Sequence, residues 1–149
     1  MVKTFELKKA GLQKLATWLL EELMVKIENH GAFVALYGDL GAGKTAFVKE
    51  IAKLLGVREE IISPTFILKK EYEVNLREVE KLVHVDAYRF TEKKEGNVLN
   101  LDDDILPKIL AIIEWPERLE KRHFDAELVF EYVDEYTRKI TATIHEKNY

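Results

Sequence analysis

The stretch that decides the fold is Val34-Ala-Leu-Tyr-Gly-Asp-Leu-Gly-Ala-Gly-Lys-Thr45. Its first four residues are apolar or aromatic, which is typical of a buried strand. Residues 38–45 fit the pattern G-x-x-x-x-G-K-[ST]. Apolar residues then recur at helical spacing, and Gly56 stands where a helix C-cap belongs. A strand, a glycine loop and a helix in this order predict an α/β fold with a phosphate-binding loop.

Each residue type in the loop suits a triphosphate ligand. The three glycines of the loop permit positive φ angles, so that backbone N–H groups can turn inward around phosphates. The helix that starts near Lys44 adds unpaired N–H groups and the positive end of its dipole. Lys44 is predicted to reach the β- and γ-phosphates, and the Thr45 hydroxyl to ligate Mg²⁺. The alternative is a glycine-rich turn that binds nothing, against which the flanking strand and helix both argue.

Composition indicates an ordinary globular chain. Its 149 residues suit a single domain spanning residues 1–149, with 47% hydrophobic and 34% charged residues. The absence of cysteine excludes disulfides and thiolate metal sites. No apolar run has the length of a membrane span and no signal-type segment follows Met1, so we expect a cytoplasmic protein. The net charge is −4 and Lys/Arg residues are dispersed, so we do not expect the chain to bind RNA alone.

Two further apolar runs end in carboxylates. Leu-Val-His-Val precedes Asp86, and Leu-Ala-Ile-Ile precedes Glu114. A carboxylate that leaves a sheet beside a phosphate loop can hold Mg²⁺ or its waters. The two residues therefore provide separate candidates for a metal ligand and for a group that activates water. His84 alternates with Asp86 and is predicted to be structural rather than catalytic.

The remaining elements predict a mixed sheet. Residues 8–28 form an amphipathic helix, residues 67–74 and 82–85 a hairpin, and residues 127–132 and 139–145 a terminal antiparallel hairpin. Residues 1–7 are compatible with a short strand or an arm. We expect a three-layer α/β fold like that of P-loop NTPases, with a mixed sheet in which the phosphate-loop strand is central and antiparallel hairpins extend the sheet.

The segment Ser63-Pro64-Thr65-Phe66 is shaped by its proline, which restrains two residues. Ser63 or Thr65 can sense a γ-phosphate, as switch segments do. The same segment is equally compatible with a turn that starts a strand.

Four motifs together resemble one family. They are Gly-Asp-Leu-Gly-Ala-Gly-Lys-Thr, Ser-Pro-Thr-Phe, His-x-Asp-x-Tyr-Arg and Glu-Trp-Pro-Glu, in that order and at suitable spacing. The chain resembles the TsaE (YjeE-like) family of bacterial P-loop ATPases over nearly its whole length. This resemblance implies an ATP-hydrolysing subunit that supports formation of threonylcarbamoyladenosine in tRNA. It implies TsaB and TsaD as partners, with TsaD as the transferase, and contact with tRNA only within their complex.

The resemblance also implies roles for particular residues. Asp86 is similar to the family's acidic residue that orients or activates water, and Thr45 and Glu114 are similar to its Mg²⁺ ligands. Thr65 is similar to its switch threonine. The implied ATP-binding residues are Gly38, Asp39, Leu40, Gly41, Ala42, Gly43, Lys44, Thr45, Thr65, Trp115 and Arg138.

The sequence departs from the family pattern at two places. Ala46 replaces a commonly found second threonine, which removes a possible contact to the α-phosphate. The acidic segment that usually follows Tyr-Arg is poorly matched by residues 100–105.

Two other functions remain as alternatives. A small-molecule kinase shares the loop, but such an enzyme usually has an arginine-bearing lid, and the six arginines here are dispersed. A GTPase is disfavoured because the Asn-Lys-x-Asp signature is absent.

Overall fold

A computed structural model describes residues 1–62, 68–93, 101 and 106–146. The strands are β1 (Val2–Lys8), β2 (Ala32–Tyr37), β3 (Lys69–Glu73), β4 (Lys81–Asp86), β5 (Ile109–Glu114), β6 (Ala126–Tyr132) and β7 (Thr137–Ile144). The α-helices are α1 (Leu12–His30) and α2 (Lys44–Leu54), and the 3-10 turns are η1 (Lys9–Gly11) and η4 (Pro116–Arg118).

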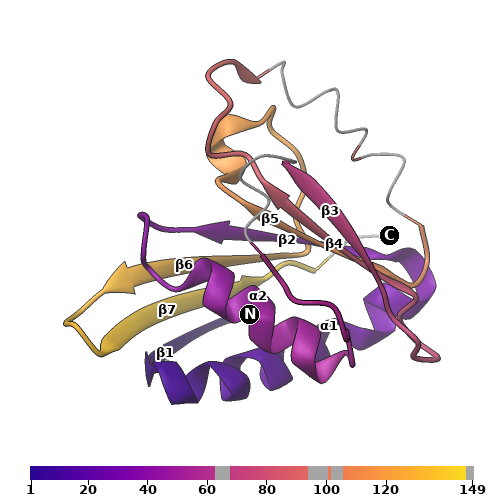
Figure 1. Cartoon of the computed structure of the whole chain (residues 1–149), viewed down its shortest axis with the longest axis horizontal. Coiled ribbons are helices and arrows are strands. Elements are labelled where there is room, and N and C mark those ends of the chain that lie inside the picture. The colour runs from indigo at the N-terminus through magenta and orange to yellow at the C-terminus, as the bar shows by residue number, and fades with distance from the viewer. Residues whose placement is uncertain (63–67, 94–100, 102–105, 147–149) are drawn as a thin grey trace.

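All seven strands form one mixed sheet in the order β1-β7-β6-β2-β5-β4-β3 (Figure 1). The four inner strands β6, β2, β5 and β4 are parallel to one another, whereas β3 on one side and β7 and β1 on the other pair antiparallel. The α/β class, the mixed sheet, the central phosphate-loop strand and both antiparallel hairpins are thereby confirmed. Residues 2–8, for which the sequence left two possibilities, form an edge strand.

The strand β2 is almost entirely apolar because both of its faces are covered. Val34 and Leu36 face the α-helices, and Phe33 and Ala35 face the opposite side. A parallel pair flanks it on each side, so the loop that follows Tyr37 emerges at the middle of the sheet. This central position is where ligands bind in open parallel sheets.

The helix α1 buries a single apolar stripe. Its buried side chains are those predicted from the spacing: Leu12, Leu15, Ala16, Leu19, Leu20, Leu23 and Ile27. The helix begins later than the expected residues 8–28, because β1 continues to Lys8 and η1 follows it, and it ends two residues later, at His30. None of the helices in the described part of the chain has the length and apolar character that a membrane crossing requires.

The expected three-layer arrangement is not found in the described residues. Both α-helices pack against each other and against the same face of the sheet (Figure 1). The other face has its own apolar cluster, which is closed by side chains from connecting segments: Phe90, Leu101, Leu119 and Phe124. One reason is length, since residues 115–125 between β5 and β6 are too few for a full crossover helix and contain only η4.

Candidate functional site

The phosphate loop leaves β2 at Gly38 and enters α2 at Lys44. Ala42 N–H donates to the Asp39 carbonyl at 3.1 Å, which forms the turn of the loop. Gly43 has a φ of 104° and caps α2 without any side-chain hydrogen bond. The first N–H groups of a helix have no intrahelical partner, so these donors remain available to an anion at this end of α2.

Lys44 is buried beneath the loop. Its ammonium donates to the Gly38 carbonyl and lies 4.0 Å from the centre of the Trp115 ring. This places Trp115, which the resemblance assigns to the nucleotide site, beside the loop lysine. The ammonium carries three N–H donors, so it can contact a phosphate while one of them is directed at Gly38.

Burial lowers the pKa of Lys44, because a desolvated ammonium is less stable than a hydrated one. Neighbouring carboxylates act in the opposite direction and offset part of this effect. In decreasing order they belong to Glu114, Glu117, Asp86 and Asp39. The site therefore contains one partly compensated cation among several anions, which favours the arrival of a metal ion together with phosphate.

The two strand-end carboxylates are neighbours. Asp86 at the end of β4 pairs in register with Glu114 at the end of β5, and both side chains are buried. The Thr45 hydroxyl lies 3.2 Å and 3.3 Å from the two Glu114 carboxylate oxygens. Asp86 Oδ1 accepts a hydrogen bond of 2.9 Å from the Tyr88 N–H, which orients the carboxylate at the strand end. The structure thus brings Lys44, Thr45, Asp86 and Glu114 to one end of the parallel strands.

The donor set fits Mg²⁺ better than a softer ion. Thr45 and Glu114 supply a hydroxyl and a carboxylate, which are oxygen ligands. In the described part of the chain, no three His, Cys, Asp or Glu side chains gather closely enough to hold an ion unaided. Mg²⁺ commonly has this environment, because it keeps several waters and takes phosphate oxygens from the substrate.

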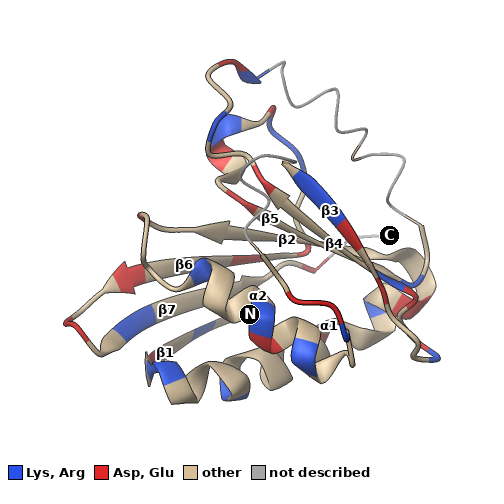
Figure 2. Ribbon diagram, viewed as in Figure 1, with Lys and Arg blue, Asp and Glu red and all other residues tan. Residues whose placement is uncertain are grey.

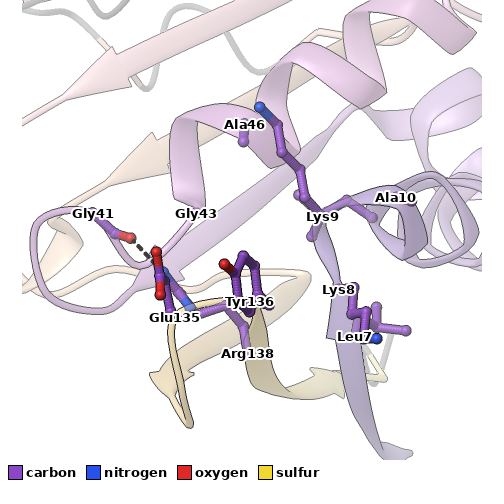
Figure 3. A pocket seen from close by; sticks show the side chains of 11 residues that line it. Leu7, Lys8, Lys9, Ala10, Gly41, Gly43, Ala46, Glu135, Tyr136 and Arg138 are labelled. Carbon is purple, nitrogen blue, oxygen red and sulfur yellow. Dashed lines mark hydrogen bonds between the residues drawn. The ribbon is translucent and has the colours of Figure 1, made fainter.

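A hollow of about 600 Å³ lies between the phosphate loop, the β6–β7 turn and the start of the chain (Figure 3). Gly41, Gly43 and Ala46 form its wall on the loop side, the β6–β7 turn contributes Tyr136, and the start of β7 contributes Arg138. The start of the chain forms the remaining wall through Leu7, Lys8, Lys9, Ala10 and Leu12. Its size is that of a pocket for a drug-sized ligand. Ala46, where the second threonine is missing, faces this hollow.

Arg138 connects the β6–β7 turn to the loop. Its guanidinium donates to the Gly41 carbonyl at 3.3 Å and to the Asp134 carbonyl at 2.7 Å, and it lies 4.6 Å from the Tyr132 ring centre. The predicted position of this late arginine near the loop therefore agrees with the geometry. Thr65, the predicted switch residue, lies outside the described residues.

Sequence reasoning missed two neighbours of the site. Arg118 donates to the Tyr88 carbonyl, and its guanidinium lies 5.2 Å from the Trp115 ring centre. Its position four residues after Glu114 could have indicated this, because a tight turn after a strand brings the following residues back to the strand end. His84 was predicted to be structural rather than catalytic, and nothing in the sequence indicated that its ring would lie 2.6 Å from a Glu114 oxygen.

Comparisons with known proteins agree with one another. The family model described as "Threonylcarbamoyl adenosine biosynthesis protein TsaE" matches residues 8–141. A tRNA threonylcarbamoyladenosine biosynthesis protein TsaE of Nostoc sp. is 37% identical over 149 residues, covering 96% of this chain and 86% of that protein. The protein of the same name from Aquifex aeolicus is 37% identical over 126 residues, covering 83% of this chain and 86% of the relative.

Coverage is smaller for some relatives. The match with TsaE of Mycobacterium tuberculosis is 37% identical over 108 residues, and it covers 66% of this chain and 64% of that protein. The chain thus spans less than two thirds of the mycobacterial relative's length.

Comparison with a solved structure also supports the relationship. The crystal structure of YdiB from Bacillus subtilis superimposes with a TM-score of 0.65 and 27% identity, covering 97% of this chain and 87% of that chain. The family model, the relatives and the superposition all extend beyond the phosphate loop, which is shared by many unrelated enzymes. On these grounds the chain belongs to the TsaE family.

Proposed function

We propose that this protein is an ATPase subunit of the machinery that makes threonylcarbamoyladenosine in tRNA. The names of its relatives support the pathway, and the site supports the chemistry. The observation that carries the proposal is the contact of Thr45 with Glu114 directly beside Lys44, at the N-terminus of α2. This arrangement offers a cation, oxygen ligands for a metal and free N–H groups at one place, as phosphoryl transfer requires.

Each residue then has a defined role in binding Mg²⁺–ATP. The loop residues 38–45 cradle the phosphates, Lys44 contacts the β- and γ-phosphates, and Thr45 with Glu114 holds Mg²⁺. The metal, when bound, neutralises charge that develops on the phosphate oxygens. Asp86, held by the Tyr88 N–H, orients the attacking water. Thr65 is proposed as the γ-phosphate sensor on the basis of its motif alone.

The hollow between the loop and the β6–β7 turn is the proposed place for the nucleoside. Tyr136 and the aliphatic side chains of Leu7 and Leu12 provide apolar contacts there. Arg138, which donates to the Gly41 carbonyl, is close enough to reach a phosphate or ribose at the rim of the loop. A nucleotide placed in this way extends from the hollow across the loop to Glu114.

We infer that hydrolysis depends on partners. Arg118 donates to the Tyr88 carbonyl, and Arg138, which contacts the Gly41 carbonyl, is assigned to the nucleoside end of the site, so we place neither arginine at the γ-phosphate. An arginine supplied by another protein accelerates related switches by about 10³–10⁵-fold. TsaB and TsaD are the proposed partners.

The surface beside the loop suits a protein partner. Leu40 and Tyr132 line one hollow at the rim, and both side chains are exposed, as is Tyr136 on the neighbouring turn. Exposed apolar and aromatic side chains that gather at one place mark interaction sites. By contrast, Lys/Arg and Asp/Glu residues alternate over the visible elements (Figure 2), and the net charge is −4. We therefore propose that tRNA is contacted only within the complex.

The test is steady-state ATP hydrolysis by the protein alone, with TsaB–TsaD, and with tRNA added. We expect a slow basal rate that the partners increase, and a Lys44→Ala variant that stays inactive throughout. Phosphate release should match ATP consumption. A high basal rate that the partners leave unchanged would contradict the proposal, and transfer of phosphate to a small acceptor would favour a kinase instead.

A further inference from the structure

His84 occupies an apolar layer in which a histidine is not needed for packing. It is fully buried in β4, and the residues on the same face of β4 and β5 are Leu82, Leu110 and Ile112. Burying an imidazole is unfavourable unless its ring nitrogens are hydrogen-bonded. Its Nε2 lies 2.6 Å from Glu114 Oε2, and among the described residues its Nδ1 has no hydrogen-bond partner. The single polar contact that this ring makes there is therefore to Glu114.

Strand register explains how the two side chains meet. His84 is paired with Ile112, whereas Glu114 is paired with Asp86 at the strand end. The Glu114 carboxylate therefore reaches back from the strand end, diagonally across the parallel pair, to meet His84. A carboxylate accepts hydrogen bonds only, so Nε2 carries the proton and donates to Oε2.

The contact limits where the carboxylate can point. Glutamate has three side-chain torsions, and an unsupported glutamate at a strand end samples several rotamers. His84 holds Oε2 from within the sheet, and on the helix side Thr45 Oγ1 lies 3.2 Å from Oε1 and 3.3 Å from Oε2. The carboxylate is consequently kept beside the threonine hydroxyl, where the two residues can face one ion.

We propose that His84 is a positioning residue that orients Glu114 for Mg²⁺. This inference rests on the proposed role of Glu114 as a metal ligand. Groups that hydrogen-bond to metal ligands typically contribute about 10–100-fold to metal affinity, because they reduce the freedom that the ligand loses on binding. A histidine that only fills space would have no such effect, since an apolar side chain of similar size would serve equally well.

The experiment compares three substitutions at His84. A glutamine places its amide nitrogen near the position of Nε2 and can still donate to Glu114, so His84→Gln is the conservative variant. An asparagine places its amide nitrogen near the position of Nδ1 and cannot reach, and a leucine has no donor. ADP affinity is measured by calorimetry over a range of Mg²⁺ concentrations and in EDTA, so that turnover does not interfere. Thermal unfolding in EDTA reports the structural effect separately.

We expect His84→Leu and His84→Asn to raise the half-effective Mg²⁺ concentration by about 10–100-fold. ADP affinity in EDTA should be unchanged, and His84→Gln should remain within a few-fold of the wild type. In a Glu114→Ala background, His84→Leu should have no further effect on the Mg²⁺ dependence. If His84→Leu does not fold, the Gln and Asn variants still provide the comparison.

Two results would overturn the inference. One is a wild-type Mg²⁺ requirement in His84→Asn or in folded His84→Leu, and the other is an equal impairment of the Gln and Asn variants. Mg²⁺-independent ADP binding by the wild type would instead contradict the proposed function, and the inference with it.

Discussion

Gly38 should be the least replaceable glycine of the phosphate loop. Its φ of 146° lies in a region that L side chains rarely adopt. A Cβ at this position would lie 2.7 Å from the Phe130 carbonyl oxygen and 3.1 Å from the Phe130 Cβ, both in the neighbouring strand β6. Neither contact can be relieved by rotating a flexible side chain, so Gly38→Ala must shift the loop or the strand.

The expected cost has two parts. A non-glycine residue held in a rarely populated backbone region costs on the order of 1–3 kcal/mol. Forcing extra volume into a packed site costs about 1–3 kcal/mol more. The sum is about 2–6 kcal/mol, and for a chain of this length each kcal/mol lowers the Tm by about 2–4 °C. Gly38→Ala should therefore lower the Tm by about 4–24 °C.

Gly41→Ala is the matched control in the same loop. Gly41 has a φ of 78°, but a Cβ there would meet nothing within 4 Å. Only the conformational part remains, about 1–2 kcal/mol. Both variants are compared with the wild type by thermal unfolding followed by circular dichroism, without nucleotide. If Gly38→Ala is no less stable than Gly41→Ala, then β6 does not restrict the loop and the reasoning is wrong.

Three further predictions concern the charged residues of the site. Burial lowers the pKa of Lys44, so between this lowered value and its ordinary value of about 10.4 the unfolded chain binds more protons than the folded one. The free energy of unfolding of the wild type should therefore rise with pH in this window relative to that of Lys44→Met. Denaturant titrations at several pH values measure both, and an identical pH dependence in the two proteins would contradict the prediction. Glu114→Gln should raise the Mg²⁺ concentration needed for hydrolysis, as measured by kinetics. Asp86→Asn should lower turnover while calorimetry still shows ATP binding. If each variant instead shows the effect expected of the other, the two roles are exchanged. Arg138→Ala should weaken ADP binding about tenfold, because a charge-assisted hydrogen bond contributes about 1.5 kcal/mol or more; Arg138→Lys is the charge-preserving control, and unchanged calorimetric affinity in Arg138→Ala would remove this residue from the nucleotide site.

Local patterns in the sequence were sufficient for much of the architecture. The apolar run before Gly38, the stripe of α1 and the alternation in the terminal hairpin each report the surroundings of one element. Such periodicity follows from burial of one face or of both, so it can be read without knowledge of the partner element. The strand-end positions of Asp86 and Glu114 were predictable for the same reason, because parallel strands bring their carboxyl ends to one edge.

Among the described residues no α-helix covers the second face of the sheet, because the face that helices cover is not a local property of the sequence. An apolar strand is equally compatible with a helix or with a loop over its second face. Only the packing of α1 against α2 and the short connection after β5 place both described α-helices on one side. The pairing of β1 with β7 at the edge likewise depends on residues at opposite ends of the chain.

The chemical groups available at the site could be read from the sequence: a glycine loop, one lysine, one threonine and two strand-end carboxylates. Which of their atoms meet depends on the three-dimensional packing. His84 reaches Glu114 across 30 residues of chain, and Arg138 reaches the Gly41 carbonyl across 97. Contacts between residues so far apart depend on strand register and on the placement of a turn, which are set by packing of the whole sheet rather than by neighbours in sequence.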